Sequence, residues 1–264
     1  MSDKNNQAVE MDKCIEPSNK SKNESPVVFQ LSGVTKSWPS EQGFDLTVPK
    51  LTIHRGEKVA LVGFSGCGKS TLLDLLAMVL RPDKVEEFTF VTLDHKRLNV
   101  AEAWRQKNKN KLAQARMRFI GYVLQTGGLL PFLSVYDNIG LSLYGLGQPA
   151  QEAVKKLAVK LGIERHLQKY PMQLSVGERQ RVAIARAMAH EPSVVIADEP
   201  TASLDPINAT EVMGIFTQIA DEKDVTFIVA THEWERVKEL GFRRITFSLD
   251  RDPADGTVRA KATG

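Results

Sequence analysis

A glycine-rich turn between an apolar run and an apolar helix is the first stretch of this sequence that could do chemistry. GFSGCGKST, Gly63–Thr71, matches the pattern G-x-x-x-x-G-K-[ST]. Glycines let a backbone turn its N–H groups onto phosphate oxygens, and a following helix points its positive end at the same anion. The stretch therefore predicts a triphosphate site. The residues expected to contact the nucleotide are Gly63, Ser65, Gly66, Cys67, Gly68, Lys69, Ser70 and Thr71.

Within this turn, three side chains have separate expected roles. Lys69 reaches the β- and γ-phosphates, and the Ser70 hydroxyl is a ligand for Mg²⁺. Cys67 occupies a variable position of the motif, where its thiol fills space.

A pair of acids supplies the other half of the expected site. VVIADEP, Val194–Pro200, places Asp198 at the carboxyl end of a buried strand, where open α/β sheets bind ligands. A carboxylate there suits Mg²⁺, which prefers oxygen ligands. Glu199 is the next residue, so it projects differently and can address a water molecule. Together the two stretches predict a Mg²⁺-dependent nucleoside triphosphatase.

The order of six motifs along the chain narrows this prediction. GFSGCGKST is followed by Gln125, LSVGE, VVIADEP, SLD (Ser203–Asp205) and then His232. This order resembles that of ABC-type ATPase subunits, the nucleotide-binding subunits of ABC transporters, over about residues 27–250. LSVGE, at 174–178, is the most diagnostic of the six, although the family pattern is usually LSGGQ. The retained Ser175 and Gly177 are the residues expected to face phosphate.

The resemblance implies a role for each matching residue. Trp38 would stack on adenine, with Phe44 as the alternative for that role. Gln125 would touch Mg²⁺ or the attacking water, Glu199 would be the catalytic base, and His232 would contact the γ-phosphate. The implied metal ligands are therefore Ser70, Gln125 and Asp198.

The family resemblance also implies a homodimer. Ser175, Gly177 and the loop containing Asp205 would complete the ATP site of a second copy, so that two chains enclose two ATP molecules head to tail. Arg179, Arg181 and Arg186, just behind, are expected to pair with acids and support the helical part of the fold.

The region around LLPFLSVYDNI predicts the partner. With the stretch before LSVGE, it resembles the branch that serves lipoprotein-releasing, macrolide-exporting and cell-division systems. The resemblance implies that ATP hydrolysis powers a separate membrane permease, in an export or mechanotransmission system for lipoproteins, lipids or drugs.

The elements around these motifs predict an α/β fold with a parallel sheet flanked by helices. Apolar runs at 58–62, 193–197 and 225–230 predict buried parallel strands, and the stretches 71–80 and 207–220 predict helices. VVFQL and FDLTVPKLTI predict a β subdomain near the N-terminus, antiparallel by the resemblance.

The domain boundaries follow from breaks in this alternation. Residues 1–26 are polar and predict a disordered tail, and residues 27–264 predict one ATPase domain. Its core is expected at about 27–98 and 190–250, with a helical insertion at about 99–189. In the insertion, AEAWRQKNKNKLAQARMRF and QEAVKKLAVKLGI predict helices, the second with Ala153, Val154, Leu157, Ala158 and Leu161 on one face.

Composition limits the location and the partners. The 264 residues are 42% hydrophobic with a net charge of +3, which is ordinary for a globular protein. The two cysteines, Cys14 and Cys67, are expected to be unpaired thiols. No apolar run reaches the roughly 20 residues that span a bilayer, and no signal peptide is evident. We therefore expect a cytoplasmic protein, held on the inner face of the membrane through its permease.

Two other functions fit the sequence less well. A soluble ABC-type ATPase acting on DNA or ribosomes usually carries a long coiled coil or a second ATPase domain, and this sequence contains neither. A P-loop kinase has no use for LSVGE. The basic run Trp104–Arg118 could touch nucleic acid or lipid headgroups, or be a solvated helix face. No nucleic-acid partner is expected.

Overall fold

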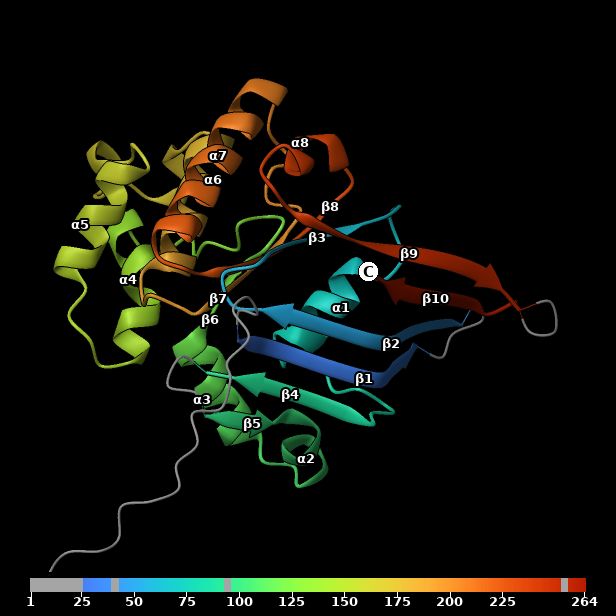
Figure 1. The fold of residues 1–264 in the computed structure, drawn as a ribbon. Helices are drawn as coiled ribbons and strands as arrows, with labels where there is room; N and C mark the ends of the chain where they lie inside the picture. Colours follow the sequence, from blue (N-terminus) through green and yellow to red (C-terminus); the bar gives the residue numbers. More distant parts are fainter. Residues whose placement is uncertain (1–25, 39–42, 93–95, 253–255) are drawn as a thin grey trace, which may run out of the picture.

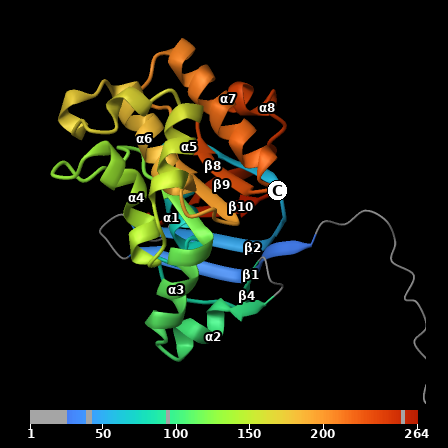
Figure 2. The same cartoon turned by 90° about the vertical axis from the view of Figure 1, so that its left-hand side faces the viewer.

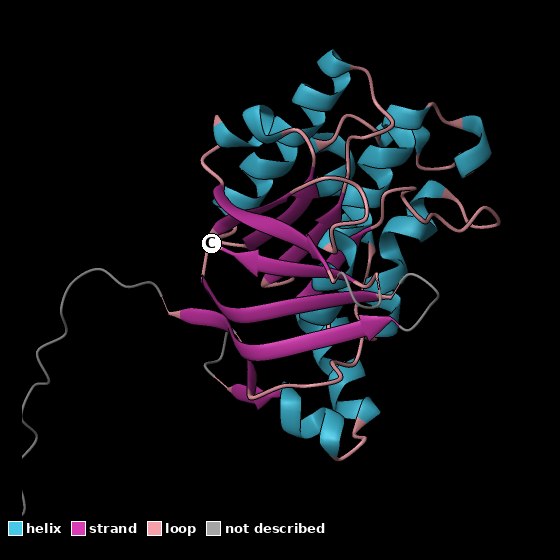
Figure 3. Ribbon diagram, turned by 90° about the vertical axis from the view of Figure 1, so that its right-hand side faces the viewer, coloured by secondary structure: helices cyan, strands magenta, loops and turns pink. Residues whose placement is uncertain are grey.

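The computed structural model describes residues 26–38, 43–92, 96–252 and 256–264. The predicted tail, 1–26, lies outside the described residues except for Pro26. The described strands form a single ten-stranded sheet in the order β5-β4-β1-β2-β10-β9-β3-β8-β7-β6 (Figures 1 and 3). The predicted α/β class is therefore confirmed.

One half of the sheet is mainly antiparallel, as predicted. β1 pairs with both β2 and β4, and β4 pairs with β5. β10 continues this half because it pairs parallel to β2 and antiparallel to β9. The strands of this half are β1 (Val27–Trp38), β2 (Phe44–His54), β4 (Glu87–Val91), β5 (Arg97–Asn99), β9 (Arg243–Arg251) and β10 (Val258–Thr263).

The other half is parallel and contains the three strands predicted from apolar runs. β3 pairs with β8 and β9, β8 pairs with β7, and β7 pairs with β6. The strands are β3 (Lys58–Val62), β6 (Ile120–Val123), β7 (Val194–Asp198) and β8 (Thr226–Thr231). The predicted boundaries were correct to within one residue.

Helices cover both faces of this parallel half, which explains its continuous apolar strands. Alternate residues face opposite cores: Val59 and Leu61 pack in the cluster that includes α1, whereas Ala60 and Val62 pack in the cluster that includes α6 and α7. The helices outside the predicted insertion are α1 (Lys69–Leu76), α7 (Pro206–Glu222) and α8 (Trp234–Lys238). None of the described helices is both long enough and apolar enough to cross a bilayer.

Two predicted helices have different ends in the structure. The helix predicted over 71–80 is wrong at its end, because α1 stops at Leu76 and Met78 has a left-handed backbone with φ of 57°. AEAWRQKNKNKLAQARMRF forms two helices, because Lys107 is also left-handed and the Asn108 side chain caps a new helix. These two helices are α2 (Val100–Arg105) and α3 (Lys109–Phe119).

The stretch predicted as a helical insertion divides between the two cores. α2 and α3 lie at one end of the molecule with β4, and the other helices of this stretch lie toward the opposite end (Figure 2). The helices at the opposite end are α4 (Val135–Gly145), α5 (Gln151–Lys160) and α6 (Val176–Met188), with the short turns η1 (Glu164–His166) and η2 (Pro171–Gln173). The predicted insertion, 99–189, also contains β6, which belongs to the sheet. The division into core and insertion at 99 and 189 therefore stays a prediction.

Two smaller predictions for this region can be compared with the structure. α5 ends at Lys160, earlier than the predicted stretch; the side chains of Val154, Leu157, Ala158 and the C-cap Leu161 are buried, and Ala153 is half-buried. Most basic side chains of the Trp104–Arg118 run are exposed.

Asn138 holds the loop that leads into α4. Its side chain is fully buried, accepts a hydrogen bond from the Leu130 N–H (2.8 Å) and donates to the carbonyls of Leu130, Leu133 and Ser134. A buried amide with four backbone partners fixes the conformation of the loop.

We expect Asn138→Ala to lower the free energy of unfolding by about 2–4 kcal/mol. The substitution leaves buried backbone groups of the 130–134 loop without partners, and each unpaired group costs about 1–3 kcal/mol. Urea denaturation of the full chain measures the change. Gln114→Ala, at an exposed site on α3, should change it by less than about 0.5 kcal/mol. Equal stabilities of the two variants would contradict this role of Asn138.

Candidate nucleotide site

The phosphate-binding turn joins β3 to α1, as the sequence predicted. Gly66 and Gly68 have φ of 78° and 102°, a conformation that glycine adopts without strain. At Gly68 space is restricted as well, because a Cβ there would lie 3.1 Å from Cζ of Phe44. The turn therefore requires glycine for both its backbone and its packing.

Lys69 is buried beneath this turn at the start of α1. Its ammonium group donates to the carbonyls of Gly63 (2.8 Å) and Phe64 (3.0 Å) and lies 3.6 Å from Oε1 of Glu199. The side chain is only 5% exposed, so its charge acts where solvent screens little. A fixed positive charge thus stands between the turn and the acids after β7.

The turn, the acids and Gln125 line one hollow. Most of the predicted nucleotide and metal residues meet there, and Phe44 joins them. The lining residues are Phe44, Ser65, Gly66, Gly68, Lys69, Ser70, Thr71, Gln125, Asp198 and Glu199. Cys67 does not line it: the side chain is buried, and a Cβ on Gly63 would lie 2.6 Å from its sulfur. Burial also raises the pKa of the Cys67 thiol. The buried side chain fills space, and a contact of Cys67 with the nucleotide stays a prediction.

Asp198 and Ser70 form the part of the hollow that could hold a cation. Burial raises the pKa of the Asp198 carboxyl, and the neighbouring Glu199 and Asp74 raise it further, whereas a hydrogen bond from Ser70 lowers it. Tyr122 donates to Asp74 at 3.0 Å behind this group. A buried acid beside further acids, in contact with a hydroxyl, is an environment that a bound cation would stabilise.

Glu199 lies between two potential cations. Its Oε1 is 3.6 Å from Nζ of Lys69, and its Oε2 is 3.5 Å from Nδ1 of His232. The backbone has φ of 42°, uncommon for a residue other than glycine, and is held by a hydrogen bond from the Glu199 N–H to the carbonyl of Ala230. The strained turn directs Glu199 into the hollow beside Asp198.

The two aromatic candidates for adenine lie side by side on the β1–β2 hairpin. Trp38 and Phe44 are cross-strand partners. Trp38 is 46% exposed, with Nζ of Lys36 5.0 Å from its ring centroid, whereas Phe44 lines the hollow. The structure therefore places both rings at the end of the hairpin nearest the turn, and the alternative stays open.

Ser175, Gly177 and Asp205 lie in a second hollow. Within the described residues it shares no lining residue with the first. Ser175 caps α6, and Asp205 caps α7 by accepting from the N–H groups of Ile207 and Asn208. Val176 and Ile207 leave exposed apolar surface beside it. The LSVGE motif thus stands apart from the phosphate-binding turn of its own chain.

The three arginines behind LSVGE support the fold as predicted, but the predicted pairing with acids is found only for Arg181. Arg179 donates to the carbonyl of Leu174. Arg181 pairs with Glu211 at 2.9 Å. Arg186 donates to the carbonyls of Gly127 (2.7 Å) and Gly128 (2.8 Å) in the loop after Gln125. Two of the three bind backbone carbonyls and not acids, and Arg186 ties α6 to the Gln125 loop.

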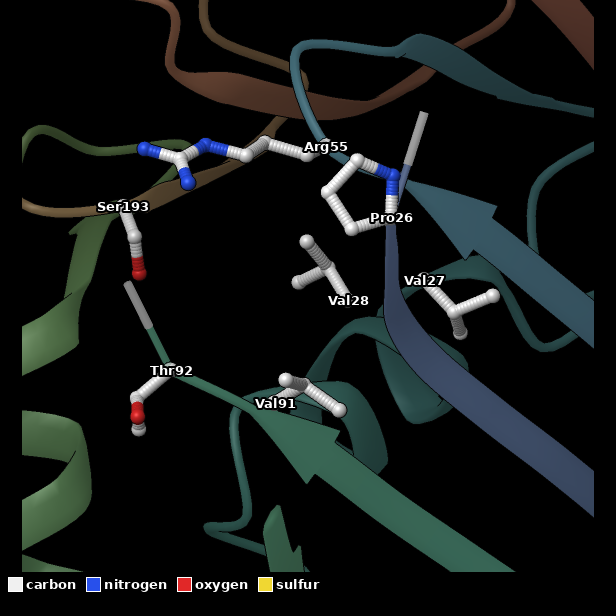
Figure 4. A pocket seen from close by; sticks show the side chains of 7 residues that line it. All are labelled: Pro26, Val27, Val28, Arg55, Val91, Thr92 and Ser193. Carbon is white, nitrogen blue, oxygen red and sulfur yellow. The ribbon is translucent and has the colours of Figure 1, made fainter. Parts of the chain in front are cut away.

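A third hollow is lined mainly by apolar side chains of β1 and β4. Figure 4 shows the valines of β1 and β4 around it, with Arg55 and Ser193 at its edge. Arg55 forms an ion pair with Asp224 at 3.1 Å. None of the residues predicted for the site lies there.

Comparisons with known proteins agree with this geometry. A sequence model described as "ABC transporter" matches residues 46–202. The lipoprotein-releasing system ATP-binding protein LolD of Aquifex aeolicus is 38% identical over 198 residues, which cover 74% of this chain and 83% of that protein. The ABC transporter ATP-binding protein YtrE of Bacillus subtilis is 36% identical over 197 residues, covering 72% and 79%.

Solved structures agree as well. The dimeric structure of MJ0796, a bacterial ABC transporter cassette, superposes with a TM-score of 0.70 and 31% identity, covering 83% of this chain and 93% of that one. A dimeric post-hydrolysis state of the same cassette, bound to ADP and Pi, has a TM-score of 0.68 and 29% identity, covering 87% and 96%. Motif order, fold and these matches together show that the chain belongs to the ABC transporter family, as an ATP-binding and ATP-hydrolysing subunit.

Proposed function

We propose that two copies of this chain bind two ATP molecules between them and use hydrolysis to drive a separate membrane permease. The observation that carries the proposal is the separation of the two hollows. One contains the phosphate-binding turn and Glu199, and the other contains LSVGE. Head-to-tail pairing gives both hollows a use, because each ATP then lies between the turn of one chain and Ser175 of the other. The dimeric structures among the structural relatives support this arrangement.

Mg²⁺ is the cofactor that the first hollow fits. Ser70, Gln125 and Asp198 offer a hydroxyl, an amide and a carboxylate, all with oxygen atoms, in one lining. The described residues contain no cluster of three or more His, Cys, Asp and Glu that could hold a metal ion by itself. Bound there, Mg²⁺ would neutralise negative charge on the phosphate oxygens.

The residues around the γ-phosphate would act as follows. Lys69 binds it, and Glu199 takes a proton from the attacking water. His232, on the other side of Glu199, is 58% exposed and can turn toward the nucleotide. Phe44 or Trp38 stacks on the base. In the second chain, Ser175 donates its hydroxyl and Gly177 its N–H at the positive end of α6.

The names of the relatives support a choice of permease partner. Several are named as subunits of the lipoprotein-releasing system, so a permease for lipoproteins or other lipids is the first candidate. The relatives also include the methionine import protein MetN 1 of Listeria monocytogenes, 37% identical over 211 residues. Through such a permease the chain would sit at the inner face of the membrane.

The test is purification of the tagged chain from detergent-solubilised membranes of its own cells. We expect a membrane-spanning protein to co-purify, and the ATPase activity per chain to be higher in that complex than in the isolated chain. A chain found only in the soluble fraction, with ATPase activity stimulated by DNA or ribosomes, would contradict the proposal and favour a soluble ABC-type ATPase.

A further inference from the structure

His166 is a buried histidine in contact with the LSVGE motif. It lies in η1, its side chain is 5% exposed, and its Nε2 is 2.8 Å from Oε1 of Glu178. The other carboxylate oxygen of Glu178 accepts from the Ser175 N–H at 2.7 Å. Glu178 therefore joins the histidine to the serine that we propose contacts ATP in the partner chain.

Helix capping explains only half of this arrangement. Ser175 and Glu178 form a capping box, in which the Glu178 N–H also donates to Oγ of Ser175 at 3.3 Å. A capping box needs only one carboxylate oxygen of Glu178. The second oxygen is held by the histidine, so the carboxylate has no freedom to rotate.

The hydrogen bond also fixes the state of the imidazole. A 2.8 Å contact with a carboxylate requires a proton on Nε2, because the ionised oxygen has none to give. Nε of Arg165 lies 3.1 Å from the same nitrogen, but a protonated Nε2 cannot accept from it. Nδ1 is buried without a partner in the described part of the chain, so a second proton there would be unpaired. The contact with Glu178 is therefore made through Nε2 as the donor.

The backbone around His166 is equally fixed. Its N–H donates to the carbonyl of Ile163 at 2.9 Å, and its carbonyl accepts from Lys169 at 2.8 Å. The carbonyls of Leu167 and Lys169 in turn accept from the first turn of α4. Hydrogen bonds thus hold His166 in a fixed position between α4 and α6.

We propose that His166 is a positioning residue for the trans ATP contact: through Glu178 it holds Ser175 in the conformation that receives the γ-phosphate of the partner chain. This inference rests on the proposed function. Ordering Ser175 before the chains meet lowers the cost of dimerisation, since a mobile serine would have to be ordered on binding. Without His166, ATP-driven dimerisation should need more ATP, while the chain's own phosphate-binding turn stays intact.

Two variants that both end in an amide but differ in length test the inference. His166→Gln places an amide N–H near the position of Nε2, whereas His166→Asn is one methylene shorter and ends near the position of Nδ1. Both are compared in a Glu199→Gln chain, which we expect to hydrolyse ATP poorly and to keep the dimer. Sedimentation measures dimerisation against ATP concentration, and a fluorescent ATP analogue measures nucleotide affinity at chain concentrations too low for dimers.

We expect His166→Asn to need roughly fivefold to tenfold more ATP for half-maximal dimerisation, the equivalent of one lost hydrogen bond of ordinary strength. His166→Gln should restore most of the loss. The affinity of the single chain for nucleotide should be the same in both variants as in the Glu199→Gln parent. His190→Gln, at a half-buried histidine just beyond the end of α6 and about 18 Å from Glu178 by helix rise, serves as a control for general destabilisation and should leave dimerisation unchanged.

Each other outcome overturns the inference. Unchanged dimerisation in His166→Asn, or equal losses in Asn and Gln variants, would mean that the donor at Nε2 has no positioning role. Thermal unfolding identifies a variant that fails to fold. If His166→Asn does not fold, Glu178→Ala takes its place, and unaltered dimerisation in that variant would equally overturn the inference. A Glu199→Gln parent that does not dimerise with ATP contradicts the proposed function itself, whereas a dimerising parent with an unaffected His166→Asn contradicts only the positioning role.

Discussion

Glu199→Gln should lower the rate of ATP hydrolysis by roughly 10²–10⁴-fold, the usual contribution of a general base. The amide keeps the size of the side chain but cannot take a proton from water. ATP binding should persist, because Lys69 keeps its carbonyl partners Gly63 and Phe64. The chain should therefore accumulate as an ATP-bound dimer, measured by phosphate release and by size exclusion with ATP and Mg²⁺.

A matched glutamate outside the site is the control. Glu235 lies on α8 with a side chain 84% exposed, and it lines neither the first nor the second hollow. Glu235→Gln should hydrolyse ATP like the parent. A Glu199→Gln chain that stays monomeric and keeps the parental turnover would contradict the role given to Glu199.

The phosphate-binding turn and the buried strands could be predicted because their signals are local. A short apolar run between polar residues can satisfy its burial only inside a sheet covered on both faces. The strand 58–62 was predicted at its observed bounds, and those at 193–197 and 225–230 were displaced by one residue. Asp198 and Glu199 were placed for the same reason, since they follow a strand end.

The ends of the helices could not be predicted in the same way. Composition continues as helical through Met78 and Lys107, yet both residues have left-handed backbones in the structure. At Met78 the carbonyl accepts from Arg116 of α3, a partner 38 residues away. Such a contact fixes the chain direction from outside the segment, so the segment's own propensities do not reveal it.

β9 and β10 show a similar limit. Their sequences alternate polar and apolar residues weakly, and β10 gains its place by pairing with both β2 and β9. The position of Phe44 is also long-range, because it depends on the packing of β2 against Gly68. His166 gave no usable signal, since a single histidine twelve residues before Glu178 becomes meaningful only when η1 folds back onto α6.

The division of the predicted residues between two hollows follows from geometry alone. Ser175, Gly177 and Asp205 cap or begin helices whose N-termini meet away from the turn at 63–68. The residue types can be read from the sequence, and the family resemblance implies that they contact ATP. Only the fold shows that the residues of the first hollow and those of the second lie apart in one chain. This separation is the physical basis for expecting a dimer.

Lys69→Ala should have the opposite effect on dimerisation from Glu199→Gln. Lys69 is the only cationic residue in the lining of the first hollow, within the described chain, and it faces two acids there. Without it, Asp198 and Glu199 would repel the triphosphate, and a hydrogen bond between charged groups would be lost. We expect ATP to bind at least roughly tenfold more weakly, with hydrolysis and ATP-driven dimerisation both abolished.

Lys58→Ala is the control for Lys69→Ala. Lys58 begins the strand that leads to the turn, and it forms an ion pair with Asp221 at 2.9 Å at the far end of that strand. The control loses the same charge and a similar contact, so its ATP affinity, measured by titration calorimetry, should match that of the parent. Because Glu199→Gln keeps the dimer and Lys69→Ala prevents it, the double variant should follow Lys69→Ala and remain monomeric. A double variant that dimerises with ATP would show that the chains associate without the nucleotide held by the turn, and would contradict ATP as the link between the two hollows.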